Sequence, residues 1–298
     1  MSFLNIFKKK KILITHDGTF HADDLFATAT LSILNKGNIK IIRTRDVKMF
    51  EKGDYLYDVG GENDEERNNF DHHQEGGGGV RPNGVPYASF GLVWKKYGEQ
   101  ICGGKEIAKK IEEKLVCSID ANDNGINLFD VKGEVAPYTL QDILFSFRPS
   151  WKEEQDFDKI FTKLVKFAVD IINREIIKTR DELEAELFIR SAYEKAKDKR
   201  IIILDGNYPW GEIIDQYKEP LYIVSMKNNL WRVEAVRKEK YGFETRKPFP
   251  ESWAGKRDYE LAGITGVSDA TFCHNGRFLS VAKSKESAIK LAEKALLA

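Results

Sequence analysis

The sequence predicts an α/β protein with a mostly parallel N-terminal sheet flanked by helices, a helical connector, and a smaller C-terminal α/β or α+β domain. Short β-rich runs alternate with helical patterns near the N-terminus, a long stretch without proline or glycine follows, and further β-rich runs come after it. The chain has 298 residues, which is enough for two cores. We therefore expect domains over residues 11–150 and 200–298, joined by a connector over 151–199.

The first domain should begin with a strand, loop, helix unit. A helix over Asp23–Leu34 fits after the first strand, because its apolar residues recur at helical spacing and Gly37 follows as a stop signal. A loop with four consecutive glycines, Gly76–Gly79, should be mobile. The expected strands are Ile12–Thr15, Ile39–Arg43 and Tyr55–Asp58, and the further helices are Ala88–Tyr97 and Lys105–Cys117.

The connector has apolar residues at three- and four-residue spacing between Lys152 and Asp198. Such a helix would be long, so we expect a break near the polar stretch Lys178–Glu182. The C-terminal domain should contain three strands and end in an amphipathic helix. The expected elements are Ile201–Leu204, Leu221–Val224, Trp231–Val236 and Lys285–Leu297.

Composition excludes several classes of protein. Lysine and arginine total 47, as do aspartate and glutamate, so no global field attracts nucleic acid or anionic lipid. The three cysteines are far apart, which excludes a disulfide framework and a CxxC site. No stretch of apolar residues is long enough for a membrane helix, and the basic run near the start is placed unlike that of a secretory signal. We expect a soluble, cytoplasmic protein without a membrane partner, and a homo-oligomer is compatible with the sequence.

The distribution of histidines is the strongest functional signal. The chain has only five, and four of them lie in two short acidic clusters, His16–Asp24 and Phe70–Gln74. The clusters follow expected strands, where an open parallel sheet places its ligand crevice. Residues 58–75 contain seven acidic residues against one basic residue, Arg67. A crevice this acidic requires cations.

These residue types point to a site for two metal ions. Imidazoles and carboxylates without a thiolate suit Mn, Mg, Fe or Zn, and a majority of oxygen ligands favours Mn or Mg. Two ions about 3.5 to 4 Å apart would activate a water molecule and clamp a phosphoryl group. We therefore expect two divalent cations, Mn²⁺ being favoured and Mg²⁺ or Zn²⁺ being alternatives. Asp120, after the expected helix from Lys105, is a further candidate ligand.

Several motifs occur in order and together resemble a known family: THDGTFHADD, RTRD, YDVGG, FDHHQ and GLVWKKYG. They are similar to the DHH phosphoesterase superfamily, and within it to the branch of the melanocyte proliferating gene product, which comprises metal-dependent exonuclease-like hydrolases. The resemblance implies a DHH-like catalytic domain and a C-terminal substrate-binding domain. The implied activity is that of a 3′-to-5′ exonuclease or oligonucleotide phosphodiesterase, with single-stranded nucleic acid, RNA in particular, or a short oligonucleotide as substrate.

The resemblance also implies roles for individual residues. His73 would face the substrate, while Asp24 and Asp71 would orient imidazoles. The superfamily has His, three residues, Asp, one residue and Asp, whereas here four residues separate His16 from His21, so the assignment of the first cluster to each ion stays open. The implied metal ligands are His16, His21, Asp23, Asp58, His72 and Asp120.

A basic, aromatic segment in the C-terminal domain is the candidate substrate grip. Lys227–Arg257 has nine basic against four acidic side chains, interleaved with aromatic residues that include Tyr241. Phosphate attraction combined with base stacking holds single strands without sequence preference. The same charges are also typical of solvated strands. The candidate substrate contacts are Arg43, Arg45, Arg237, Lys238, Lys240 and His274.

Two alternative functions remain open at this point. Phe20–Asp24 resembles the short His-Pro-Asp-Asp signature of zinc-dependent sugar deacetylases, in which zinc activates water against an amide. The Asp-His-His sequence at Asp71–His73 and the additional carboxylate of Asp58 argue against that class. A non-catalytic metal-binding scaffold is the second alternative, because ligands can persist after substrate binding is lost.

Overall fold

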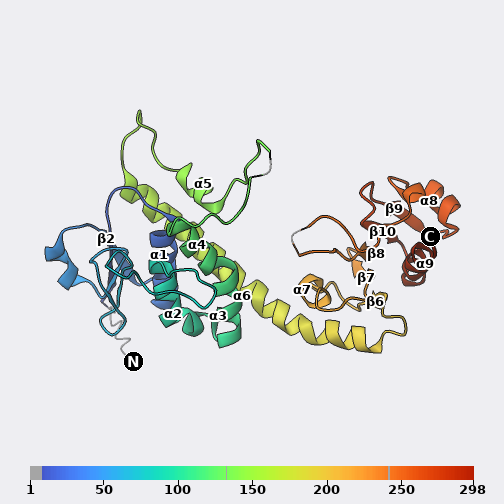
Figure 1. Ribbon diagram of the computed structural model, residues 1–298, viewed down its shortest axis with the longest axis horizontal. Coiled ribbons are helices and arrows are strands. Elements are labelled where there is room, and N and C mark those ends of the chain that lie inside the picture. Colours follow the sequence, from blue (N-terminus) through green and yellow to red (C-terminus); the bar gives the residue numbers. More distant parts are fainter. Residues whose placement is uncertain (1–8, 132, 241) are drawn as a thin grey trace, which may run out of the picture. The chain divides into compact units, whose positions relative to one another are not determined.

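The computed structural model describes residues 9–131, 133–240 and 242–298. The chain divides into two compact units, Met1–Arg180 and Asp181–Ala298 (Figure 1). Each unit contains a five-stranded sheet flanked by helices, which confirms the α/β class with two domains. The boundary between the units falls inside one long helix, so the predicted bounds of the two domains and the separate connector stay predictions.

The sheet of the first unit has the strand order β2-β1-β3-β5-β4. Its strands are β1 (Lys11–Thr15), β2 (Ile39–Arg43), β3 (Tyr55–Tyr57), β4 (Asn63–Asp64) and β5 (Asn69–Phe70). β1 pairs in parallel with β2 and β3, and β3 pairs in parallel with β5, whereas β4 is antiparallel to β5. The predicted strand Tyr55–Asp58 ends one residue early because Asp58 has a φ of +55°. The carboxyl ends of β1 and β3 therefore lead directly into His16 and Asp58.

Helices pack on this sheet. They are η1 (Val47–Lys52), α1 (Ala22–Leu34), α2 (Ser89–Cys102), α3 (Lys105–Ile111), α4 (Cys117–Asp123) and α5 (Leu140–Phe145). Two of them, α4 and α5, carry residues that line the same pocket as His16 and Asp58 at the carboxyl ends of β1 and β3. The helix predicted to end at Cys117 instead continues through a π-helical turn, η2 (Glu112–Val116), into α4. Asp120 and Asp123 are consequently helical residues, one turn apart on the same side of α4.

A single helix, α6 (Phe157–Lys195), runs through both units (Figure 1). The break predicted near Lys178–Glu182 is wrong. Buried residues occur before, within and after this stretch, at Ile176, Thr179 and Ala185, so the polar side chains between them occupy the exposed face of one continuous helix. No helix among the described residues is both long enough and apolar enough to cross a membrane.

The sheet of the second unit has the order β6-β7-β8-β10-β9. Only β6 and β7 are parallel, so the sheet is mixed. The three predicted strands are present with shifted ends, and the final helix α9 (Lys285–Leu297) has the predicted bounds. The other elements are β6 (Ile201–Ile203), α7 (Gly211–Ile214), β7 (Tyr222–Lys227), β8 (Leu230–Ala235), η3 (Glu251–Trp253), α8 (Asp258–Thr265), β9 (Ala270–Cys273) and β10 (Leu279–Ala282).

The glycine-rich loop is anchored at several points. The Gly77 N–H donates to the Gln74 carbonyl, and a short antiparallel bridge joins Val80 to Pro86. Arg81 is buried, with its guanidinium 3.9 Å from the ring centre of Tyr87. These contacts hold the loop beside the start of α2, while its mobility stays a prediction.

The first residues of α2 connect α1 and α4 through hydrogen bonds. Asp23 of α1 accepts hydrogen bonds from the N–H groups of Ser89 (3.2 Å) and Phe90 (2.6 Å). Asp120 of α4 accepts one from the N–H of Gly91 (3.1 Å). A Cβ on Gly91 would lie 1.8 Å from Asp120 Oδ2, so only glycine fits at this position.

We predict that Gly91→Ala destabilises the protein by about 2 kcal/mol, because overpacking at this buried contact exceeds the gain of about 1 kcal/mol in helix propensity. Urea unfolding followed by tryptophan fluorescence measures the shift. Gly263→Ala is the control: Gly263 is helical in α8 with no described atom within 4 Å of an added Cβ, so alanine should stabilise there. Equal effects of the two substitutions would contradict the packing argument.

Candidate metal centre

His16 follows β1 and presents one ring nitrogen to two carboxylates. Its Nδ1–H donates to the backbone carbonyl of Asp17 (2.9 Å). Its Nε2 lies 3.1 Å from Asp58 Oδ2 and 3.3 Å from Asp24 Oδ2. Burial disfavours the charged ring, but the two carboxylates outweigh it and raise the pKa of His16 to about 10. A backbone acceptor on one nitrogen and carboxylates at the other is the usual arrangement of a metal-binding histidine.

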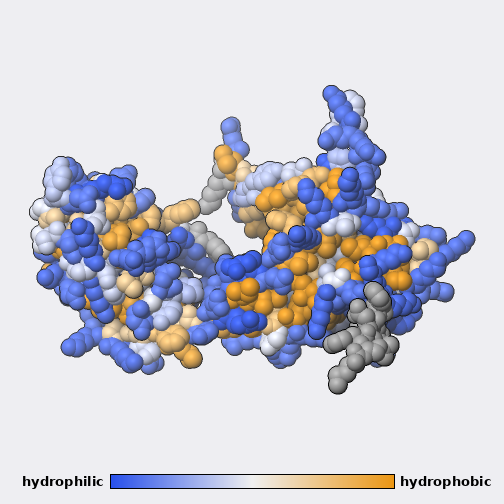
Figure 2. Space-filling view, turned by 180° about the vertical axis from the view of Figure 1, so that it is seen from behind, coloured by the Kyte–Doolittle hydropathy of each residue, from blue (hydrophilic) through white to orange (hydrophobic). Residues whose placement is uncertain are grey.

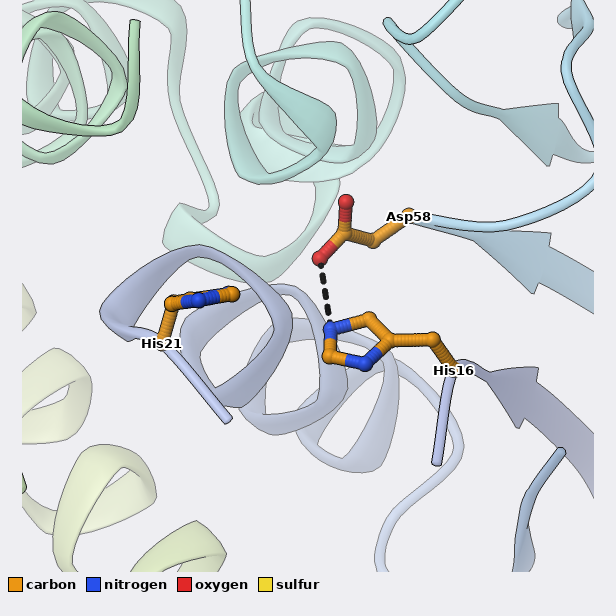
Figure 3. Close-up of side chains that lie close together, drawn as sticks. All are labelled: His16, His21 and Asp58. Carbon is orange, nitrogen blue, oxygen red and sulfur yellow. Dashed lines mark ion pairs between the residues drawn. The ribbon is translucent and has the colours of Figure 1, made fainter. Parts of the chain in front are cut away.

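Asp58 is the centre of the cluster. It is buried and has a left-handed backbone conformation, which aspartate adopts more readily than most residues. Its Oδ2 faces His16, and its Oδ1 lies 3.5 Å from His72 Nε2. Burial would raise the pKa of Asp58, yet hydrogen bonds and charge from His16 and His72 hold it below the ordinary value. Figure 3 shows His16, His21 and Asp58 converging from the ends of β1 and β3 and the start of α1.

Asp71 organises the second histidine pair. Its Oδ1 accepts the backbone N–H of His72 (2.8 Å) and the Nδ1–H of His73 (2.7 Å), and its Oδ2 accepts the N–H of Gly61 (2.6 Å). Burial would raise the pKa of Asp71, but these hydrogen bonds lower it. The hydrogen bond to Asp71 raises the pKa of His73. With Nδ1 engaged, His73 has Nε2 left for a ligand.

Within the described part of the chain, three groups of side chains bring ligand atoms within 4.8 Å of one another. Two members belong to more than one group: Asp58 joins the first to the second, and His72 joins the second to the third. The groups are His16, His21 and Asp58; Asp58, His72 and His73; and Asp23, His72 and Asp123.

The residues at this site fit a divalent cation. Among the described residues, Asp24 Oδ2 and His72 Nε2 are buried polar atoms whose nearest charged neighbours, His16 Nε2 and Asp123 Oδ2, both lie at 3.3 Å without hydrogen-bond geometry. A buried acceptor of this kind is costly unless a cation or donor satisfies it. The donor set combines imidazole nitrogen with carboxylate oxygen and lacks thiolate, so it can bind Mn, Mg or Zn.

The structure places Asp120 differently from the expectation that it binds metal. Its Oδ2 lies 2.7 Å from Arg81 Nη2 in a buried ion pair, and it belongs to none of the three groups. Burial, opposed by Arg81, raises the pKa of Asp120 to about 7. Asp123, one turn further along α4, approaches His72 Nε2 at 3.3 Å and belongs to the third group, so it is the candidate ligand that α4 offers. Sequence analysis missed Asp123, although its spacing of three residues from Asp120 was a usable signal.

Asp23 and Asp24 lie side by side in the sequence but have different surroundings. Asp23 binds the start of α2 and also belongs to the third group. Burial, followed by repulsion from Asp123 and Asp58, raises the pKa of Asp23 well above its ordinary value. Asp24 accepts the backbone N–H of His21 (2.8 Å) and faces His16, which fits the expected orienting role.

The two arginines expected to contact substrate have different environments. The Arg43 side chain is only 2 % exposed; it pairs with Asp158 of α6 and lies 4.4 Å from the ring centre of Phe161. It therefore links β2 to α6 and is not presented to a ligand. Arg45 is 61 % exposed, pairs with Asp17 at 2.6 Å and lines the pocket at the cluster.

The other expected substrate contacts are in the second unit. Lys238 pairs with Glu244 and Lys240 with Glu212, both at 2.8 Å, while Arg237 lies over the ring of Phe243. His274 follows β9; its Nδ1 accepts the N–H of Gly276, and its ring contacts Phe278. Tyr241, one of the aromatic residues noted in this segment, lies outside the described residues.

Comparison with known proteins gives one consistent result. Residues 12–296 match the MYG1_exonuc family model, described as "Uncharacterised protein family (UPF0160)". The chain is 32% identical to "MYG1 exonuclease" of Bos taurus and 30% identical to "MYG1 exonuclease" of Homo sapiens, with 95% of this chain and 84% and 85% of those proteins covered. "MYG1 protein" of Dictyostelium discoideum is 30% identical, over 95% of this chain and 96% of that protein.

We predict that Asp123→Asn lowers the affinity for Mn²⁺ by at least about 100-fold, because it removes a carboxylate from the cluster. Asp120→Asn should instead lower stability, by about 3 kcal/mol, because Arg81 loses its carboxylate partner on α4. Isothermal titration with Mn²⁺, under conditions in which both variants are folded, separates the two effects. A larger loss of affinity in Asp120→Asn than in Asp123→Asn would restore Asp120 as the ligand.

Proposed function

This chain belongs to the MYG1_exonuc family, the uncharacterised protein family UPF0160, and we propose that it is a metal-dependent phosphoesterase that acts on single-stranded nucleic acid, with RNA as the first substrate to test. Its activity is that of a 3′-to-5′ exonuclease or oligonucleotide phosphodiesterase. The names of its relatives from Bos taurus and Homo sapiens support an exonuclease-like hydrolase. Membership of the wider DHH superfamily is part of this proposal and rests on the motifs.

One observation carries the proposal: Asp58 is shared between two neighbouring groups of candidate ligands. A shared carboxylate can bridge two adjacent cations through its two oxygens, which a single structural ion does not require. His72 also belongs to two groups, but the one ring nitrogen that it presents can bind a single ion. Asp58 presents one oxygen to His16 and the other to His72, as a bridging carboxylate does. The three groups hold four imidazoles and three carboxylates and no thiolate, a mixed nitrogen and oxygen donor set that suits Mn²⁺ as well as Zn²⁺, and Mn²⁺ is the first ion to test.

Bound divalent cations would supply Lewis-acid activation of a water molecule and neutralise phosphoryl oxygens. The side chains of this protein then have distinct tasks. The backbone carbonyl of Asp17 orients the His16 ring through Nδ1. Asp71 positions His72 by accepting its backbone N–H. His73, held through Nδ1 by Asp71, is 63 % exposed, and its Nε2 would be available to a phosphoryl oxygen of the substrate.

We predict that Asp58→Asn and His72→Ala each reduce hydrolysis of a single-stranded RNA oligonucleotide by at least about 1,000-fold, because each removes a ligand shared between groups. The assay follows a 5′-labelled RNA with Mn²⁺, Mg²⁺ or Zn²⁺ and resolves the products by size. Asp54→Asn is the control: this carboxylate pairs with Lys11 at the opposite end of β1 and should keep full activity.

The same assay separates the proposal from its alternatives. An exonuclease releases mononucleotides stepwise and leaves a circular strand intact. Release of acetate from acetylated sugars with Zn²⁺, and no cleavage of RNA, would identify a deacetylase. Tight metal binding with neither activity would identify a scaffold. Full activity of Asp58→Asn would remove the metal cluster from the mechanism.

The second unit is proposed to hold the strand beyond the bond that is cut. Replacing Arg237, Lys238 and Lys240 by alanine should weaken oligonucleotide binding, and each lost phosphate contact should reduce the salt slope by about 0.7. Fluorescence anisotropy at several salt concentrations measures both quantities. Alanine at Lys285, Lys290 and Lys294 of α9 removes the same charge from the same unit and serves as the control. Equal effects of the two triple variants would show that oligonucleotide binding depends only on the net charge of the unit and not on these three positions.

A further inference from the structure

The pocket at the metal centre has two chemically different halves. Its volume is about 760 Å³, in the range of pockets that hold one small molecule. One half carries the candidate ligands and their neighbours. The other half has no acidic or imidazole side chain; it is formed by Val47 and Phe50 of η1 and by the backbone turn Val59–Gly61.

The second half is apolar, and its Val47 side chain is exposed without an evident structural reason, while Phe50 is partly buried. Val47 is 70 % exposed although it lines the pocket, and it stands beside Phe50. Hydrophobic residues also interrupt the hydrophilic surface elsewhere (Figure 2), so exposure alone decides nothing. What distinguishes Val47 and Phe50 is that their apolar surface is continuous with a cluster of candidate metal ligands.

The turn after β3 leaves space beside these side chains. Gly60 and Gly61 both have a positive φ, which glycine adopts at little cost, and neither places a side chain in the pocket. A Cβ on Gly60 would lie 3.9 Å from the Phe50 ring and one on Gly61 would meet nothing described within 4 Å. The backbone of this turn can therefore approach a flat ligand lying against Phe50.

Polar groups surround this apolar half. Arg45 lines the pocket and pairs with Asp17. Gln141 of α5 also lines the pocket, and its Oε1 accepts the N–H of Ala22 at the start of α1 (3.0 Å). Its amide Nε2 can donate to a ligand. Phe145 of the same helix lies 6.5 Å from the His21 ring, so α5 is tied to the residues around the candidate ligand His21.

A ligand for this pocket must combine an anionic group with an adjacent flat apolar group. We propose that the half formed by Val47, Phe50 and Val59–Gly61 is a base-binding subsite for the terminal nucleotide whose phosphate group lies at the metal centre. This inference rests on the proposed function and deepens it, because a pocket for one nucleotide selects the end of a strand. Charge complementarity supports it, since the phosphate group meets the cations and the base meets the uncharged wall.

Two probes that differ only in the base test the subsite directly. Adenosine 5′-monophosphate and ribose 5-phosphate share the sugar and the phosphate group, so the ratio of their dissociation constants isolates the base. Isothermal titration of the full chain with Mn²⁺ present should show adenosine 5′-monophosphate binding at least about fivefold more tightly. Val47→Asn and Phe50→Ala should each reduce this ratio about threefold or more.

Val135→Asn is the matched control, because Val135 is 81 % exposed and does not line the pocket. It should keep the ratio of the unmodified protein. Equal affinity for the two probes in the unmodified protein would overturn the subsite, as would a ratio unchanged in both pocket variants. Because the titration involves no turnover, a preference for the base without hydrolysis of any oligonucleotide would contradict the proposed function alone. Hydrolysis without that preference would contradict the subsite alone.

Discussion

Two buried carboxylates, Asp23 and Asp120, accept the unpaired N–H groups at the start of α2, and the geometry of the metal centre depends on this arrangement. The first N–H groups of a helix have no partner within the helix, and its dipole favours negative charge there. Asp23 lies two residues after His21, and Asp120 lies one turn before Asp123. Holding the two carboxylates at one helix end therefore sets the separation of the candidate ligands on α1 and α4.

The concentration of negative charge then determines what the site can bind. Asp23 is buried, Asp123 is partly buried, and both are close to Asp58. Burial and then repulsion from Asp123 and Asp58 raise the pKa of Asp23, while burial and then repulsion from Asp58 raise the pKa of Asp123. His16 and His72 offset part of this charge at Asp58. Protonation of the carboxylates is one way to neutralise the remaining negative charge. Binding of a divalent cation is the other way, because a cation neutralises several carboxylates and also satisfies the buried polar atoms.

The sequence was sufficient to predict the parts of the site that follow strands. His16 and Asp58 come directly after β-rich runs, and parallel strands bring their carboxyl ends to one edge of a sheet. Asp123 could not be predicted from the end of a strand, because it lies on a helix. That helix was expected to end at Cys117 but continues through the π-helical turn η2 into α4, so the spacing of three residues from Asp120 was the available signal. The short strands β4 and β5 were also missed, since two residues carry no detectable alternation. The predicted break in α6 failed because polarity on an exposed helix face does not interrupt hydrogen bonding.

Net charge in a segment overstates the field that a ligand meets. The excess of basic residues over Lys227–Arg257 suggests a strong attraction for phosphate, yet Lys240 pairs with Glu212, an acidic residue outside that segment. Arg246 donates to the backbone carbonyls of Tyr217 and Pro220, and these hydrogen bonds hold its guanidinium in place within the second unit. Ion pairs at exposed positions are weak and exchange with phosphate at little cost, whereas a guanidinium bonded to buried carbonyls does not. The proposed attraction of this segment for a nucleic-acid strand should thus depend on its exposed lysines more than on its total charge.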